Sequence, residues 1–188
     1  MRYSSSGVGE PGVSISMRQR RQIRRGAEYH VIARVNRNEY IFESIVVKEL
    51  FLMVLRRAKK KYRFTVRNFC IMDNHIHLII RPGPDEALSK IMQWVLSVFA
   101  VRFNRHYGYV GHVWYDRFKS RIIDSIKGLV ATFVYIANNP VAAGIVDTPA
   151  AYQYSGLHHI RDGDFDIVAP PDETVRSVIA LRNLLGYE

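Results

Sequence analysis

The first regular pattern in the chain is an alternation of polar and apolar residues over residues 27–37, AEYHVIARVNR. Side chains two positions apart share one face of a strand, so this period predicts a half-buried strand. Residues 43–62 instead carry apolar side chains at helical spacing and predict a helix. That segment ends in a cluster of cations, which stabilise the negative end of the helix dipole: Arg56, Arg57, Lys59, Lys60 and Lys61.

The next two segments repeat the change from strand to helix. Residues 64–81 are rich in β-branched and aromatic side chains and end at a Pro-Gly-Pro run, which predicts two strands with a turn near residues 73–74. Residues 85–108 carry apolar side chains on one helical face and predict a long helix, with Asp85 as its N-cap.

Residues 112–124 alternate again: one set of every second residue is mainly apolar, and the other set contains the cations. This pattern predicts a strand with a basic face. Residues 125–140 predict a further helix that ends at Pro140, because a residue before proline avoids the helical region. Residues 150–188 predict a loop-rich segment with one short helix near the end of the chain.

The predicted order is strand, helix, two strands, helix, strand, helix. This order is typical of an α+β sandwich in which helices pack on one face of an antiparallel sheet. The sequence contains no internal repeat, and 188 residues with 48% apolar side chains are enough for one compact domain. We assign residues 1–22, rich in Ser, Gly and Arg, to a disordered extension, residues 23–155 to the domain and residues 156–188 to a C-terminal tail.

The net charge of the chain indicates which class of molecule it binds. Lys and Arg number 27 against 17 Asp and Glu, which gives a net charge of +10 and favours a polyanion such as nucleic acid. The single Cys70 excludes an intramolecular disulfide, and no stretch is long and apolar enough for a membrane span. The N-terminus lacks the apolar segment of a secretory signal, so we expect a cytoplasmic protein.

Two histidines stand out in the second strand of the 64–81 pair. His75 and His77 are separated by one isoleucine, so a strand projects both imidazoles from the same face. One interpretation is a pair of packed, hydrogen-bonded histidines within a sheet. The other is half of a metal site.

The helix predicted for residues 125–140 supplies further candidates. Its apolar residues gather on one side, whereas Tyr135 and Asn139 lie one turn apart on the small, polar side. Tyr135 is either an ordinary surface tyrosine or a nucleophile. The side-chain oxygen of Asn139 can complete a two-histidine site for Mg²⁺, Mn²⁺ or Zn²⁺.

These residues also carry a family resemblance. The segment MDNHIHLIIRP resembles the histidine, hydrophobic residue, histidine (HUH) motif of the single-tyrosine transposases, and YIANNPVAAGIV resembles their tyrosine-bearing helix. Further blocks within residues 26–155 recur in the same order in the REP-associated branch of that family. The chain departs from the family pattern at Asp73, where a proline is usual, and in YIANNP, where YIHLNP is commoner.

The resemblance implies a ferredoxin-like HUH endonuclease fold and a transposase that cuts and joins single-stranded DNA, usually beside hairpins or repeats. It implies that His75, His77 and Asn139 bind Mg²⁺ or Mn²⁺ and that Tyr135 forms a 5′-phosphotyrosine intermediate. It also implies a monomer or homodimer, acting on the nucleoid in the cytoplasm of a prokaryote.

Several cations are candidates for contacts to DNA phosphates: Arg34, Arg117, Lys119 and Arg121. The Arg56–Lys61 cluster is either a second contact or a solvated helix end. Trp114 is expected in the core rather than as a stacking platform for bases. His30 is expected to be a structural or DNA-contacting residue.

Two other functions remain open at this stage. The first is a module of the same ancestry that binds DNA hairpins without cutting them. The second is a basic, ferredoxin-like RNA-binding domain, which would expose aromatic residues on its central strands and would have no use for paired histidines facing a tyrosine.

Overall fold

The computed structural model describes residues 24–185, and the extension predicted for residues 1–22 lies outside them. Four antiparallel strands form one sheet in the order β2-β3-β1-β4. The strands are β1 (Glu28–Arg34), β2 (Phe64–Ile71), β3 (His75–Pro82) and β4 (Lys119–Ile123).

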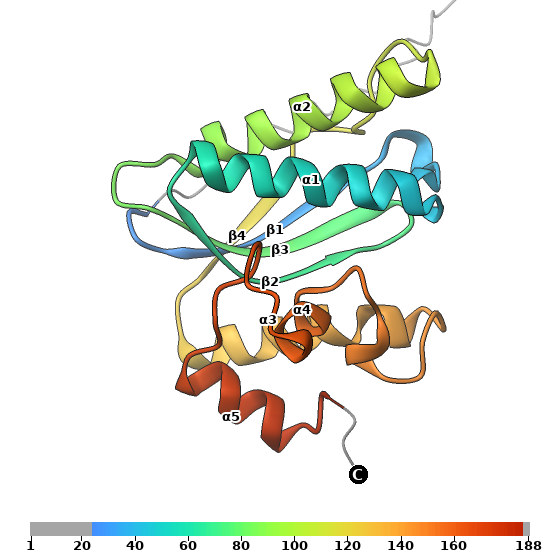
Figure 1. Ribbon diagram of the computed structural model, residues 1–188. Helices are drawn as coiled ribbons and strands as arrows, with labels where there is room; N and C mark the ends of the chain where they lie inside the picture. The colour runs from blue at the N-terminus through green and yellow to red at the C-terminus, as the bar shows by residue number, and fades with distance from the viewer. Residues whose placement is uncertain (1–23, 186–188) are drawn as a thin grey trace, which may run out of the picture.

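Helices cover both faces of this sheet, and Figure 1 shows α1 and α2 above it with α3, α4 and α5 below. The helices are α1 (Ile45–Lys61), α2 (Leu88–Tyr107), α3 (Ile126–Ala142), α4 (Gly156–Asp162) and α5 (Glu173–Leu181). The predicted α+β sandwich is therefore confirmed, and helices on the second face add to it.

The main core lies between the sheet and the α1–α2 layer. Phe42, Phe51 and Phe99 are fully buried there, and their rings contact one another. Trp114 packs against all three rings, and its indole nitrogen donates a hydrogen bond to the Leu96 carbonyl at 2.9 Å. The assignment of Trp114 to the core is thus confirmed.

The basic strand is shorter than the pattern predicted, because β4 covers only residues 119–123. Residues 116–118 interrupt the pairing with β1, and residues 113–115 pair again with residues 34–36 through two backbone hydrogen bonds around the bridge of Trp114 with Val35. The alternation therefore spans two short paired stretches and an irregular segment between them, and not one continuous strand.

Two helix boundaries also differ from the prediction. α2 begins at Leu88 and not beside Asp85. α3 continues through Pro140 to Ala142. A proline in the last turn lacks only its own N–H, so the helix loses one hydrogen bond and still closes; the Asn139 carbonyl accepts from Ala143.

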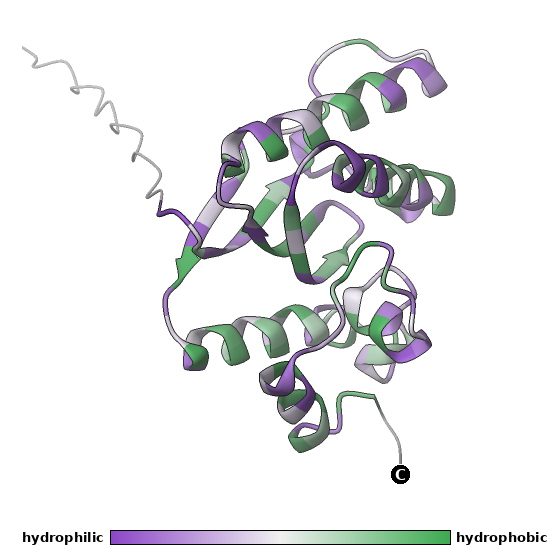
Figure 2. Ribbon diagram, turned by 60° about the vertical axis from the view of Figure 1, so that its left-hand side comes forward, coloured by the Kyte–Doolittle hydropathy of each residue, from purple (hydrophilic) through white to green (hydrophobic). Residues whose placement is uncertain are grey.

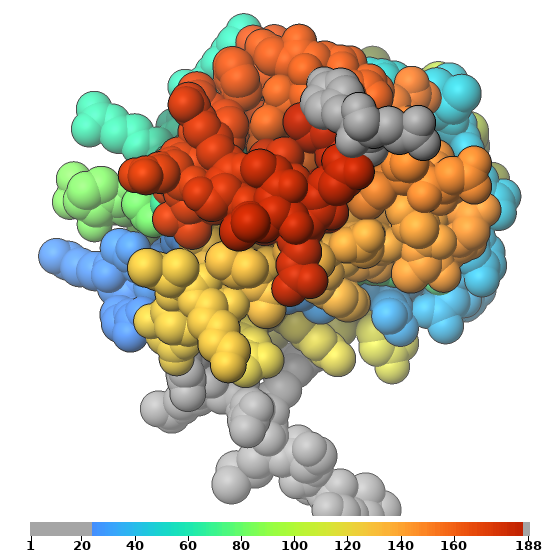
Figure 3. Space-filling model, turned by 90° about the horizontal axis from the view of Figure 1, so that it is seen from below, coloured from blue at the N-terminus to red at the C-terminus, as the bar shows by residue number. Residues whose placement is uncertain are grey.

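The second face is covered by α3 and by the C-terminal segment. α3 is the most apolar helix and is largely green in Figure 2. Viewed from below in Figure 3, α4 and α5 lie beside α3 and cover much of this face. α5 confirms the predicted short helix, and the Asp172 side chain caps it by accepting a hydrogen bond from Val175; α4 was not predicted.

Candidate active site

The site begins at the turn between β2 and β3. The Asp73 carbonyl accepts from the Phe42 amide at 3.0 Å, and the Asn74 carbonyl accepts from the Val35 amide at 2.9 Å. The Asp73 carboxylate forms an ion pair with the buried Lys48 ammonium at 3.2 Å. These three contacts fix the backbone at the start of β3, where the histidines lie.

The register of the sheet sets the direction of the imidazoles. β3 alternates so that Ile76, Leu78 and Ile80 pack into the α1–α2 core, which sends His75 and His77 to the α3 side. The two rings lie 4.8 Å apart between centroids. The predicted side-by-side arrangement on one face is therefore present.

Each of the two imidazoles has its Nδ1 atom occupied. Nδ1 of His75 lies 2.7 Å from the Asn74 side-chain oxygen, and Nδ1 of His77 lies 3.0 Å from Nε2 of His30. His77 is 2% exposed, and within residues 24–185 its buried Nε2 has no hydrogen-bond partner. A buried nitrogen without a partner is unfavourable unless another group, such as a metal ion, binds it.

Burial and nearby cations keep these rings neutral. Burial, followed by the neighbouring imidazoles and Arg34, lowers the pKa of His77 to about 3. Burial and Arg34 also lower the pKa of His75. Burial and Arg121 lower the pKa of His30. Neutral imidazole is the form that binds metals.

α3 places Tyr135 beside the histidines. Leu129, Phe133 and Ile136 are buried, and α3 packs on β2 and β3. Tyr135 lies outside this buried stripe and is 54% exposed, yet it still faces the sheet, with its ring centroid 5.5 Å from that of His77. Histidines and tyrosine thus converge within one chain.

Asn139 lies one turn beyond Tyr135 and is half-buried. Its amide nitrogen donates to the Tyr135 carbonyl at 2.9 Å, which leaves the amide oxygen as the atom suited to a cation. Among residues 24–185, no three His, Cys, Asp or Glu side chains are arranged to hold a metal ion. A metal here would therefore need an amide, solvent or substrate oxygen in addition to the imidazoles.

Cys70 pairs with His77 across β2 and β3 but is a poor ligand. Burial raises the pKa of its thiol, so the thiolate that a metal requires is disfavoured.

Three of the four predicted DNA-contacting cations lie on the same sheet face as the histidines. Arg34 pairs with His75, Lys119 lies opposite Ile32, and Arg121 lies opposite His30. All three cations are exposed, because α3 packs on β2 and β3 and leaves the β1–β4 half of this face open.

Arg117 does not join that row. It lies in the loop before β4, where it lines a separate cleft with Trp114 and Tyr115 between α2 and residues 111–118. The Arg56–Lys61 cluster lies at the end of α1, which belongs to the layer across the sheet from the histidines.

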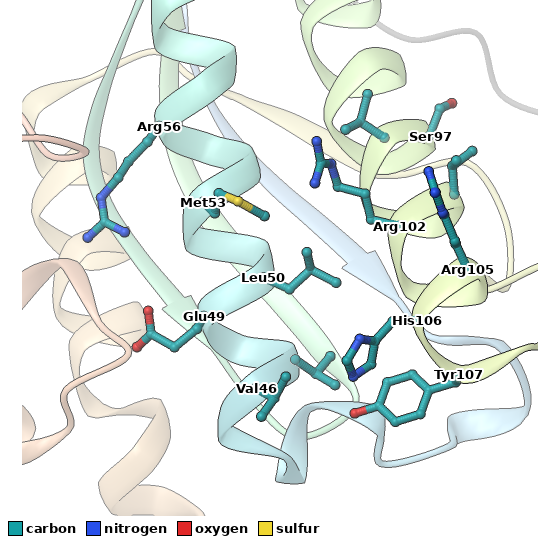
Figure 4. Close-up of a pocket in the computed structure, with 13 residues that line it drawn as sticks. Val46, Glu49, Leu50, Met53, Arg56, Ser97, Arg102, Arg105, His106 and Tyr107 are labelled. Atoms are coloured by element: carbon teal, nitrogen blue, oxygen red, sulfur yellow. The ribbon is translucent and has the colours of Figure 1, made fainter.

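A groove of about 1070 Å³ between α1 and α2 is also remote from the histidines. Figure 4 shows Leu50 and Met53 on one wall of this groove and Arg102 and Arg105 on the other. His106 lies here, on the far side of the sheet from Tyr135. At the candidate site itself, Tyr135 and the three cations are exposed, whereas His77 is buried.

From the sequence, His30 was expected only to be a structural or DNA-contacting residue. The structure places it in contact with His77. Its ring also lies 6.0 Å from that of Tyr135. The alternation in the first predicted strand places His30 and Arg34 on the same face. That local pattern does not indicate that His30 will lie next to His77 in the sheet.

The family model for IS200-like transposases matches residues 24–139, more than half of the chain and every segment of the site described above. The chain belongs to the IS200-like transposase family. The resemblance found in the sequence is thereby confirmed.

Two relatives carry the name of the REP-associated branch. A Haemophilus influenzae protein named as a REP-associated tyrosine transposase is 25% identical over 118 residues, which are 57% of this chain and 67% of that protein. A solved structure of a REP-associated tyrosine transposase bound to a REP hairpin superposes with a TM-score of 0.67 at 20% identity. That match covers 84% of this chain and 95% of the other, and it confirms the fold.

Among residues 24–185, every helix is too short or too polar to span a lipid bilayer.

Proposed function

We propose that this transposase is a metal-dependent endonuclease and strand transferase for single-stranded DNA, with Tyr135 as the nucleophile. The observation that carries the proposal is the position of the Tyr135 ring, 5.5 Å from a buried imidazole whose Nε2 has no partner within residues 24–185. A phenol beside a metal-binding imidazole is suited to phosphodiester chemistry.

The residues that would hold Mg²⁺ or Mn²⁺ are His75, His77 and Asn139. The contacts at Nδ1 leave Nε2 of each imidazole as the ligand atom, and the Asn139 amide oxygen would complete a mixed N and O donor set. The ion would supply electrostatic stabilisation of the charge that develops on the scissile phosphate.

In the proposed reaction, the Tyr135 oxygen attacks phosphorus. The Tyr135 oxygen becomes bonded to the 5′ phosphate, and the bond from phosphorus to the 3′ oxygen breaks. The phenolic proton passes through solvent to the released 3′ oxygen, which becomes a hydroxyl. The covalent bond conserves the energy of the phosphodiester, so the 3′ hydroxyl of a second strand can displace Tyr135 without an external energy source.

The open β1–β4 half of the sheet would hold the DNA strand. Arg34, Lys119 and Arg121 form an exposed row beside the histidines, and cations in this position pair with successive phosphates. Arg117 would contact the DNA only if the DNA strand continues around the edge of the sheet that β4 forms. We expect a DNA hairpin beside the single-stranded segment, because the structural relative is bound to a REP hairpin.

One chain suffices for this proposal, because Tyr135 and His77 of the same protomer already lie together. We therefore favour a monomer over a dimer that exchanges tyrosines. A DNA substrate places the proposed activity in the cytoplasm, on the nucleoid.

A hairpin-binding protein without nuclease activity is the second candidate. It is supported by the solved structural relative, which is bound to a REP hairpin.

The two candidates are separated by incubating the full chain with labelled single-stranded hairpin oligonucleotides and Mn²⁺. The endonuclease predicts a covalent protein–DNA adduct on a denaturing gel, which Tyr135→Phe abolishes. Tyr115→Phe is the matched control, because Tyr115 is also an exposed tyrosine but lies in the loop before β4. Tight binding without any adduct would support the hairpin-binding protein.

A further inference from the structure

We propose that His30 is a positioning residue that fixes the tautomer of His77, so that Nε2 of His77 presents its lone pair to the metal site. This inference rests on the proposed function and extends it to a side chain on a different strand.

The contact is specific in distance and orientation. His30 pairs with Ile79 across β1 and β3, which places it diagonally next to His77 on the same face of the sheet. Nε2 of His30 lies 3.0 Å from Nδ1 of His77, and the two rings stack with centroids 5.2 Å apart and planes 26° apart.

A hydrogen bond between two neutral imidazoles has two possible directions. If His30 donates, the single proton of His77 resides on Nε2, where it blocks metal binding. If His77 donates from Nδ1, its Nε2 carries the lone pair that a metal requires. His77 can therefore bind a metal through Nε2 only when His30 accepts the hydrogen bond between the two rings.

The buried site favours the arrangement in which His77 donates. Nε2 of His77 is buried and has no partner within residues 24–185, so a proton on that nitrogen would be a buried donor without an acceptor. A proton on Nδ1 instead has Nε2 of His30 as its acceptor at 3.0 Å.

The second histidine of the motif has an equivalent partner. Nδ1 of His75 faces the side-chain oxygen of Asn74 at 2.7 Å, and a carbonyl oxygen can only accept. That contact fixes the proton of His75 on Nδ1 and frees Nε2. Each imidazole thus has its own acceptor, a neighbour in sequence for His75 and a residue on β1 for His77.

The test uses two substitutions of His30 in the full chain. His30→Leu removes the acceptor, whereas His30→Gln keeps an oxygen at about the reach of Nε2. Loss of a partner of this kind typically weakens metal affinity about 10-fold to 100-fold. Calorimetric titration with Mn²⁺ should show that loss for His30→Leu and affinity within about threefold of wild type for His30→Gln. His106→Leu, an exposed histidine in the α1–α2 groove, is the matched control and should bind like wild type.

A second readout does not depend on metal. Nitrogen-15 shifts of the His77 ring in the metal-free protein should report a proton on Nδ1 in wild type and a population with the proton on Nε2 in His30→Leu. An unchanged tautomer, or equal Mn²⁺ affinity in wild type and His30→Leu, would overturn the inference. If wild type binds no Mn²⁺ and forms no DNA adduct, the proposed function fails, and the tautomer measurement still decides the role of His30.

Discussion

The attachment of α3 to the sheet depends on one fully buried amide, Asn68. Its Nδ2 donates to the Phe133 carbonyl in α3 at 3.3 Å, and its Oδ1 accepts from the Phe69 amide at 2.9 Å. Phe133 lies two residues before Tyr135, so this amide connects β2 directly to the part of α3 that bears the tyrosine. Asn68→Asp keeps the shape of the side chain and removes the donor.

The expected cost of Asn68→Asp depends on pH. Burial without a cationic partner raises a carboxyl pKa by about 3 units, and each unit corresponds to about 1.4 kcal/mol. Because the folded pKa lies above the unfolded value of about 3.9, the stability of the variant relative to wild type falls as pH rises between the two. The loss is then about 1.5 kcal/mol at pH 5 and about 4 kcal/mol at pH 8.

Thermal unfolding followed by circular dichroism measures this difference. For a chain of this size, 1 kcal/mol lowers Tm by about 2–4 °C, so the gap between wild type and Asn68→Asp should widen by about 5–10 °C from pH 5 to pH 8. Asn138→Asp is the matched control, because Asn138 also donates to an α3 carbonyl but is half-buried. A gap for Asn68→Asp that is the same at both pH values would show that this buried site does not disfavour a charged side chain.

Three further predictions concern packing, reactivity and DNA binding. A Cβ at Gly156 lies 2.6 Å from the Asn68 side-chain oxygen, so Gly156→Ala should lower stability by about 1–3 kcal/mol, and an unchanged Tm would contradict this contact. Cys70 is buried and its thiol pKa is raised, so a thiol reagent at pH 8 should label it only at the rate of unfolding; rapid labelling of native protein would show that β2 is open. Arg121→Ala should reduce the slope of log affinity for single-stranded DNA against log salt by about 0.7, whereas Arg57→Ala on α1 should leave it unchanged. Equal slopes for all three proteins would remove Arg121 from the DNA surface.

Local patterns predicted much of the fold. The alternation around His75 and His77 and the apolar stripe of α3 each depend on residues within one element. The side chains that are buried in the structure lie on the face that the spacing of apolar residues predicts, and Tyr135, which is not in that stripe, is exposed. For this reason, β1–β3, the helices other than α4 and the two faces of α3 could be predicted from sequence.

The remaining features depend on contacts between distant segments. The bond from His30 to His77 spans 47 residues and follows from the alignment of β1 with β3, which no local pattern encodes. The ion pair of Lys48 with Asp73 likewise joins α1 to the β2–β3 turn at the position where a proline is usual in the family. An ion pair supported by two hydrogen-bonded carbonyls can fix such a turn without proline.

The proposed function requires that Tyr135 becomes covalently joined to DNA. Digestion of the reaction with single-stranded hairpin oligonucleotides and Mn²⁺, followed by mass spectrometry of the peptides, locates the bond directly. We expect a nucleotide attached through its 5′ phosphate to Tyr135, on the peptide that also contains Asn139. Attachment to a different residue, or cleaved DNA without any modified peptide, would contradict it.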